Sequence, residues 1–215
     1  MGGNGAGNDR YNGGTGIDTI RYTSAKAGIT VDLSRGTARS IGSRDAAGIG
    51  IDTLTGLENV IAGEFNDILV GNAASNVLTG GTGADRMRGG AGRDTFKYSK
   101  LNESRLGALD RILDLQVGVD RIDGFRKVKA ADVKQLGRVR TLRESGIQAL
   151  LGAENSDLGR RNFSAYRAAT FSFVSNDSER TFLAINNGVA GFGMGGDSLI
   201  EITGYKGSLS ALEII

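Results

Sequence analysis

The sequence predicts a mainly β protein in which a repetitive coil is followed by a small α+β unit. Three observations predict this fold class. A nine-residue word recurs in one phase through the first half of the chain, short strand patterns follow it, and the region from 125 to 215 mixes helical and strand patterns. A fixed period sets the architecture, because each repeat buries its apolar face only by stacking on its neighbours.

The repeated word holds a carboxylate or its amide at the sixth place and an apolar residue at the eighth. Four consecutive copies span residues 62–97: AGEFNDILV, GNAASNVLT, GGTGADRMR and GGAGRDTFK. Their sixth places are Asp67, Asn76, Asp85 and Asp94. Three further copies, at residues 4–12, 13–21 and 47–55, carry Asp9, Asp18 and Asp52. A glycine-rich linker is the alternative interpretation, but a linker has no reason to repeat an apolar residue in phase with Asp.

The spacing within the word favours a hard cation. Gly at the first, second and fourth places lets the backbone bend sharply through positive φ, so that carbonyl oxygens point inward beside the sixth-place Asp. Calcium takes about six to eight oxygen ligands of this kind. Because Asn76 replaces a carboxylate, we expect the site between the Asn76 and Asp94 loops to be weaker than the one between the Asp67 and Asp85 loops.

Each word should form a loop followed by a short strand, so that two words make one turn of the coil. Loops 18 residues apart then stack, with Asp67 over Asp85 and Asn76 over Asp94. One buried apolar residue per word is too little to offset the ordering of nine residues at about 1–2 kcal/mol each. An ion between stacked loops would supply much of the difference, so we expect calcium binding and folding to occur together.

Composition narrows the function classes. The chain has 215 residues, with 35 Gly, no Pro, no Cys and no His, and a formal net charge of +2. Without His or Cys it cannot assemble a Ser-His-Asp triad, a Cys-His pair or a His-rich zinc site, and its Asp residues are phased as structure, so we expect no catalysis. Bound metal is the obvious stabiliser where no disulfide can form.

Several kinds of partner are not expected. Basic residues gather between Arg126 and Arg143, but only Phe125 lies near them for base stacking, so we favour a solvated helix face over nucleic-acid binding. No apolar run reaches the roughly 18 residues of a membrane span. The first four residues lack the pattern of a signal peptide.

Outside the repeats, the chain is expected to insert into the coil and then cap it. Residues 27–33 alternate as a strand and residues 36–50 form a small-residue loop, so the insertion at about 22–46 should be a hairpin or widened turn on the edge of the coil. Residues 109–124 predict two short strands joined at 116–118, within a cap at 99–124. Asp110 lies 16 residues after Asp94 and either completes a last calcium site or forms a turn.

The remaining region, 125–215, predicts a small α+β domain behind a roll domain at 1–98. Apolar residues at spacings of three and four favour a helix from Ala130 to Leu151. Strands are expected at 170–174, 181–185 and 198–203, with Gly-rich turns between them.

Residues 1–124 resemble the C-terminal part of an RTX, or hemolysin-type calcium-binding, protein. The resemblance rests on GGTGADRMRGGAGRDTF and on DRILDLQVGVDRID, the latter similar to the segment after the repeats in serralysin-type proteases. The nonapeptide is the known calcium repeat of RTX proteins. Residues 163–213 resemble the bluetail domain of bacterial RTX surface proteins through AATFSF, RTFLAINNGVAGF and DSLIEITGYKGSL, although Asn186-Asn187-Gly188 replaces the usual Asn-Asp-Gly.

The resemblance implies a right-handed parallel β-roll with calcium between its loops, coordinated by carbonyls of the first to fourth places and by the sixth-place Asp. In this chain these are Gly80, Gly81, Thr82, Gly83 and Asp85, then Gly89, Gly90, Ala91, Gly92 and Asp94. Asp67 and Asn76 face them, and Asp9 and Asp18 belong to an incomplete N-terminal stack. The resemblance also implies a secreted bacterial protein whose uncleaved C-terminal signal is read by type I secretion machinery.

The first functional hypothesis is therefore an extracellular or cell-surface calcium-binding module that folds on meeting calcium and supports type I export. One alternative is an adhesion or surface-layer module that binds cell-surface glycans or itself. Another is the C-terminal targeting part of a larger secreted enzyme. The chain begins within a word at Gly2, which favours a fragment or a truncated family member.

Overall fold

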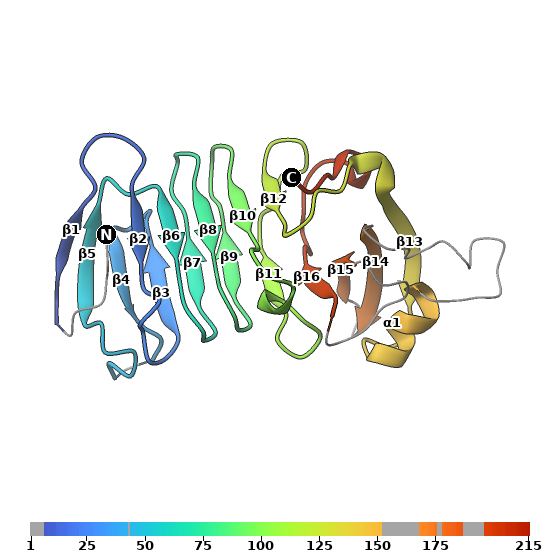
Figure 1. The fold of residues 1–215 in the computed structure, drawn as a ribbon, viewed down its shortest axis with the longest axis horizontal. Helices are drawn as coiled ribbons and strands as arrows, with labels where there is room; N and C mark the ends of the chain where they lie inside the picture. The colour runs from blue at the N-terminus through green and yellow to red at the C-terminus, as the bar shows by residue number, and fades with distance from the viewer. Residues whose placement is uncertain (1–6, 43, 152–167, 176–177, 187–195) are drawn as a thin grey trace.

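The computed structural model describes residues 7–42, 44–151, 168–175, 178–186 and 196–215. It is mainly β, and it confirms the predicted β-roll followed by a small C-terminal unit (Figure 1). The strands of the roll stack along the long axis of the molecule. Parts of the sequence analysis fall outside the described residues: the first three residues of the first word, and residues 163–167, 176–177 and 187–195 of the segment that resembles a bluetail domain.

Each copy of the word places a short strand alternately in one of two sheets. The first sheet is parallel and contains β2 (Thr19–Arg21), β6 (Asn59–Ile61), β8 (Val77–Thr79), β10 (Thr95–Lys97) and β12 (Arg121–Asp123). The roll strands of the second sheet are β1 (Arg10–Asn12), β5 (Ile51–Thr55), β7 (Ile68–Val70), β9 (Arg86–Arg88) and β11 (Asp110–Ile112). Side chains alternate along a strand, so the eighth-place residues point inward. Tyr11 is partly buried and packs against one common core, and the other six are buried in it: Ile20, Leu54, Leu69, Leu78, Met87 and Phe96.

The insertion after the second word forms an antiparallel hairpin of β3 (Ile29–Asp32) and β4 (Thr37–Ser40). The prediction that it lies on the edge of the coil is wrong. β3 pairs with β7 and β4 pairs with β5, so the hairpin lies inside the second sheet, and the expected loop at 36–50 contains a strand. The reason is burial, since Ile29 and Val31 enter the common core.

The two strands expected at 109–124 are present as β11 and β12, and each adds one further strand to a sheet of the roll. The C-terminal unit consists of β13 (Val133–Val139), α1 (Glu144–Leu151), β14 (Ala168–Ser175), β15 (Ser178–Ile185) and β16 (Ser198–Glu201). β16 pairs in parallel with β11, so the strands of this unit extend the second sheet of the roll to eleven strands. Short single-turn helices lie at Leu101–Glu103, Ala130–Asp132 and Leu209–Ala211.

The helix predicted from Ala130 to Leu151 is wrong in its first half, which forms β13. A bulge gives β13 one extra residue: Gln135 pairs with Thr170, but Arg138 pairs with Ser172. A bulge reverses the faces of the strand beyond it. Val133 therefore enters the core of the roll, whereas Leu136 and Val139 pack in a second core with the C-terminal unit. Because β13 buries apolar side chains on both faces, Val133, Leu136 and Val139 recur every three residues, as they would in a helix.

The end of the roll is covered on both sheets. β16 covers the second sheet, and the last residues of the chain cover the first, where Ile214 bridges to Ile122 of β12 and to Val128. Leu212 and Ile214 are buried in the roll core. Within the described part of the chain, no helix has the length and apolar character needed to cross a membrane.

Candidate metal centre

The loops that precede the strands stack in steps of 18 residues along each edge of the roll. β7 pairs with β9 so that Leu69 lies beside Met87, and β8 pairs with β10 so that Leu78 lies beside Phe96. We call residues 62–67 and 80–85 the first loop pair. Residues 71–76 and 89–94 are the second loop pair, on the opposite edge (Figure 1).

Glycine brings the loops of the first pair into close contact. Gly81 has φ +97° and Gly83 has φ +146°. A Cβ on Gly81 would lie 2.0 Å from the carbonyl oxygen of Gly63, and one on Gly83 would lie 2.4 Å from that of Phe65. The carbonyl oxygens of one loop therefore point at the next loop, where that of Gly63 also accepts the backbone N–H of Thr82 at 3.1 Å. Carbonyl oxygens are among the hard ligands that calcium accepts.

The first edge carries a ladder of hydrogen bonds between sixth-place residues. The backbone N–H of Asp67 donates to Oδ1 of Asp85 at 2.8 Å, and the N–H of Asp85 donates to Oδ1 of Asp110 at 2.8 Å. Asp67 has both oxygens satisfied, by the N–H groups of Ile29 and Gly63. Oδ2 of Asp85, in contrast, is buried without a hydrogen-bond partner among the residues that the structure describes, and the carboxyl group of Asp110 has the Tyr98 hydroxyl beside it.

The second edge repeats the close approach of glycines to facing carbonyl oxygens, but it has the neutral Asn76 where the first edge has Asp67. The carbonyl oxygens of Asn72 and Ala74 face Gly90 and Gly92 of the following loop, where an added Cβ would lie 2.3 Å and 2.7 Å from them. Asn76 donates its backbone N–H to Oδ1 of Asp94 at 2.9 Å, and its side-chain amide donates to the carbonyl oxygen of Glu58 at 2.8 Å. Oδ2 of Asp94 is buried and has no partner within the described residues.

Burial determines the electrostatics of these carboxyl groups. Desolvation raises the pKa of Asp67 to about 6. It raises the pKa of Asp85 to about 7, with contributions from the charges of Asp67 and Glu103. It also raises the pKa of Asp94 to about 6 and that of Asp110 well above its ordinary value. A buried carboxylate is costly unless it is compensated, so the unpartnered oxygens fit a bound cation.

The oxygen atoms available as metal ligands belong mostly to the backbone. In the described ranges, no three side chains of His, Cys, Asp or Glu converge on a point that could hold a metal ion. Any ion between the loops would therefore depend on carbonyl oxygens and one or two carboxylates. Such hard oxygen ligands fit calcium.

The N-terminal candidates make other contacts. Oδ1 of Asp52 accepts the backbone N–H of Asp9 at 2.9 Å, and its Oδ2 accepts the hydroxyl of Tyr22 at 2.8 Å. The backbone N–H of Asp18 donates to Oε2 of Glu58 at 2.9 Å. The structure thus brings Asp9 to Asp52, but both oxygens of Asp52 already accept hydrogen bonds from the protein.

Asp110 lies beside Asp85 on the first edge and not beside Asp94, the sixth-place residue that precedes it in the sequence. β11 pairs with β9, which places Asp110 over Asp85, whereas β12 pairs with β10 and places Asp120 over Asp94. The N–H of Asp94 donates to Oδ1 of Asp120 at 3.0 Å. The cause is the segment between β10 and β11, which lengthens the step along the first edge from 18 to 25 residues.

The sequence analysis missed Asp120 and Asp114. Asp120 stands two residues before an inward Ile122, as Asp85 stands two residues before Met87, so the pattern Asp-x-apolar gives a signal that could have identified it. The carboxylate of Asp114 accepts the N–H groups of Gly89 at 2.9 Å and Gly90 at 3.0 Å. It follows no repeat phase, so the sequence holds no comparable signal for it.

The comparisons with known proteins agree with this arrangement. The family described as Peptidase M10 serralysin C terminal matches residues 10–164, which is 155 of the 215 residues. The matched region is the non-catalytic C-terminal part of that peptidase family, and the family is a calcium-binding RTX type found in secreted bacterial proteins. No curated protein matches the chain significantly. The stacked glycine loops and the family match together show that the chain belongs to the serralysin C-terminal family, a group of calcium-binding RTX-type modules.

Proposed function

We propose that the chain is a secreted module whose roll folds on binding extracellular calcium, and that this folding supports type I export. The single observation that carries the proposal is the stack of glycine loops in which the carbonyl oxygens of one loop face the next, and in which Oδ2 of Asp85 and of Asp94 is buried without a partner in the described residues. Calcium supplies positive charge at the places where the fold gathers oxygen atoms.

The ligands we propose belong to the two loop pairs. Sixth-place carboxylates come from Asp85 and Asp94. The remaining ligands are loop carbonyls: Gly80, Gly81, Thr82, Gly83, Gly89, Gly90, Ala91 and Gly92, with Gly63, Phe65, Asn72 and Ala74 from the facing loops. We expect the second loop pair to bind more weakly, because Asn76 presents a hydrogen-bond donor toward Glu58.

Binding and folding are coupled by energetics. Without the ion, folding buries the carboxylates of Asp85, Asp94 and Asp110 with few compensating donors. Calcium at about ten times its dissociation constant adds about 1.4 kcal/mol of stability per site. Several sites acting together shift the folding equilibrium of the roll.

The same coupling supports export. Extracellular calcium modules bind at about 10⁻⁴–10⁻³ M, a range far above the free calcium of a cytosol. The roll would therefore stay unfolded inside the cell and pass through a channel as an extended chain. Outside, calcium would drive folding and prevent return.

Limited proteolysis of the full chain tests this proposal. Below about 10⁻⁵ M calcium we expect rapid cleavage throughout residues 59–123, and above about 10⁻³ M calcium we expect protection of the same region. Equal protection under both conditions would refute calcium-driven folding. Export itself is tested by co-expressing the chain with a type I transporter. A fusion of the chain to a domain that folds stably without calcium should accumulate inside the cell, and its normal secretion would contradict the proposal.

The family match favours a second candidate, in which the chain is the C-terminal targeting part of a larger secreted enzyme. Mass determination of the secreted product distinguishes the two. A product that carries a catalytic domain supports the second candidate, and a product of 22.4 kDa supports the first.

A further inference from the structure

Three arginine side chains lie together on the outer face of the second sheet. Arg86 and Arg88 point outward from β9, on either side of the buried Met87, and Arg111 points outward from β11. Arg86 pairs directly with Arg111 across the two strands, so their backbones are one strand spacing, about 4.8 Å, apart. We call Arg86, Arg88 and Arg111 the arginine cluster.

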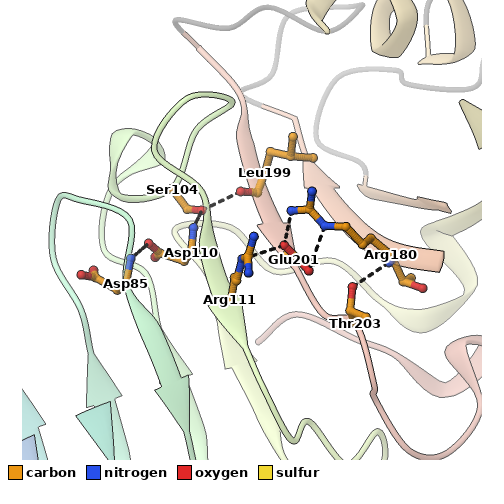
Figure 2. Close-up of polar contacts among 9 residues, drawn as sticks. Asp85, Ser104, Asp110, Arg111, Arg180, Leu199, Glu201 and Thr203 are labelled. Atoms are coloured by element: carbon orange, nitrogen blue, oxygen red, sulfur yellow. Dashed lines mark hydrogen bonds and ion pairs between the residues drawn. The ribbon is translucent and has the colours of Figure 1, made fainter. Parts of the chain in front are cut away.

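The arginine cluster has an excess of positive charge. Nε of Arg111 lies 2.9 Å from Oε2 of Glu201. Glu201 also accepts hydrogen bonds from the guanidinium of Arg180, and Figure 2 shows Arg111 and Arg180 on either side of it. The side chains of Arg86 and Arg88 form no hydrogen bond or ion pair with the part of the chain that the structure describes. Like charges on directly opposed residues are unfavourable, so an anion at the cluster would be stabilised.

A pocket of about 420 Å³ opens at the cluster, lined by Arg86, Arg111, Ala84, Gly107 and Leu109. Leu109 is partly buried against the second core, so it gives the pocket one apolar side. The ion pair with the neighbouring strand β16 orients Arg111, whose side chain is still 42% exposed. The pocket therefore combines two cationic groups, one of them held in place, with room for an uncharged organic group.

We propose that the arginine cluster binds a doubly charged oxyanion carried on a small organic molecule, namely a phosphate monoester. A planar guanidinium group donates two parallel hydrogen bonds to such an oxyanion. Four guanidinium groups, those of the cluster and of Arg180, accompany the carboxylate of Glu201, so a dianion balances more of the charge than a monoanion does. The inference goes beyond the proposed function, because it concerns the outer face of a sheet and an organic anion instead of the loops and calcium.

Arg39 of β4 distinguishes a defined site from general attraction of anions by a basic surface. It lies in the same cross-strand row as Arg86, with Thr30 and Ile68 on the two strands between them. Its side chain is exposed and, like that of Arg86, forms no hydrogen bond or ion pair within the described ranges. Three strand spacings, about 14 Å, separate the two residues, which exceeds the Debye length of about 8 Å at 0.15 M salt.

Titration calorimetry of the calcium-saturated full chain with glucose 6-phosphate, at about 0.15 M salt, tests the inference. Glucose is the neutral comparison. We expect saturable binding of glucose 6-phosphate and none of glucose. Arg86→Gln should weaken binding by about 10- to 100-fold, because it removes hydrogen bonds between charged groups. Arg39→Gln is the matched control and should weaken binding by less than about twofold, because salt screens its distant charge.

Further variants and a second ligand separate geometry from charge. Arg86→Lys keeps the charge but not the planar fork, so its affinity should lie between those of wild type and Arg86→Gln. Arg88→Gln should also weaken binding, and because neither Arg86 nor Arg88 has a side-chain partner in the described fold, these variants should keep the wild-type circular dichroism spectrum in calcium. Glucuronate carries a single negative charge and should bind more weakly than glucose 6-phosphate.

Three results would overturn the inference. A wild-type chain that is folded in calcium but binds no glucose 6-phosphate would show that the cluster is only a solvated basic surface, and it would leave the proposed function intact. An equal loss of affinity in Arg86→Gln and Arg39→Gln would show general electrostatic attraction without a site. Equal affinities for glucuronate and glucose 6-phosphate would contradict the assignment of a doubly charged ligand.

Discussion

The side-chain amide of Asn76 donates to the carbonyl oxygen of Glu58, 2.8 Å away and 18 residues earlier in the chain. A hydrogen-bond donor therefore occupies the sixth place of this loop, where Asp85 and Asp94 leave carboxylate oxygens without partners. The amide satisfies a neighbouring carbonyl without an ion. In the copy that contains Asn76, a neutral hydrogen bond therefore takes the place of a carboxylate that would need a cation.

Restoring the carboxylate at this place should increase the dependence on calcium. In chelator, Asn76→Asp should lower the free energy of unfolding by about 1–3 kcal/mol, because a buried donor is replaced by an anion facing a carbonyl oxygen. In saturating calcium the loss should disappear, and calcium binding should tighten. Urea unfolding with and without calcium measures both effects. Asn76→Ala is the control, and an equal response to calcium in the two variants would show that the carboxylate recruits no ion.

The close approach of stacked loops gives a second prediction. Gly81→Ala should destabilise the roll by about 1–3 kcal/mol more than Gly14→Ala. Both glycines have positive φ, +97° and +86°, and so share the conformational cost, but only Gly81 would place its Cβ against a carbonyl oxygen, whereas no atom lies within 4 Å at Gly14. Urea unfolding in saturating calcium gives the two free energies. Equal losses would mean that the loops are not in contact at Gly81.

The raised pKa values predict that the stability of the calcium-free protein and its affinity for calcium change in opposite directions with pH. Burial raises the pKa of Asp67 and Asp94 to about 6 and that of Asp85 to about 7. A raised carboxyl pKa means that the folded state favours the protonated form. Its stabilising effect is therefore complete below the ordinary pKa of about 4 and is lost as pH rises through 6 to 7.

Thermal unfolding of calcium-free protein should thus give a higher midpoint at pH 5 than at pH 8. The affinity for calcium should change in the opposite direction and fall as pH decreases below about 7, because protons compete for the same oxygens. Proton release on calcium binding, measured by calorimetry in buffers of different ionisation enthalpy, provides the check. A calcium-free protein that is more stable at pH 8 would contradict the assigned burial of these carboxyl groups.

The C-terminal residues should contribute to stability as well as to any export signal. Ile214 is 2% exposed and bridges to Ile122 and Val128, so Ile214→Ala should cost about 2–5 kcal/mol. Ile215→Ala is the matched control, since Ile215 is only partly buried and its backbone N–H still reaches Ile122. Urea unfolding compares them, and a loss as small in Ile214→Ala as in the control would show that these residues do not cover the roll.

The repeat made the roll predictable from the sequence. Because the eighth-place residues recur in phase with the sixth, the inward positions of Leu69, Leu78 and Met87 and the stacking of Asp67 over Asp85 follow from the period alone. Nothing local to residues 98–109 reveals how many residues the chain uses before it rejoins the coil. The partner of Asp110 could therefore not be fixed by counting.

The C-terminal unit was less predictable because its burial is set by tertiary contacts. Val133 and Val139 are buried in different cores, on opposite faces of a strand with a bulge. The apolar pattern of such a strand cannot be distinguished from that of a helix. The hairpin β3–β4 was recognisable, but its position inside the second sheet depends on pairing with strands far along the chain.

Far-UV circular dichroism during a calcium titration of chelator-stripped protein tests the central claim most directly. A cooperative gain of β signal at about 10⁻⁴–10⁻³ M calcium is predicted. Magnesium should not reproduce it, because the smaller ion requires near-octahedral geometry and gives up its water reluctantly. Asp85→Ala should blunt the gain. A protein already folded in chelator, with a spectrum that calcium does not change, would contradict calcium-driven folding and remove the physical basis for its role in export.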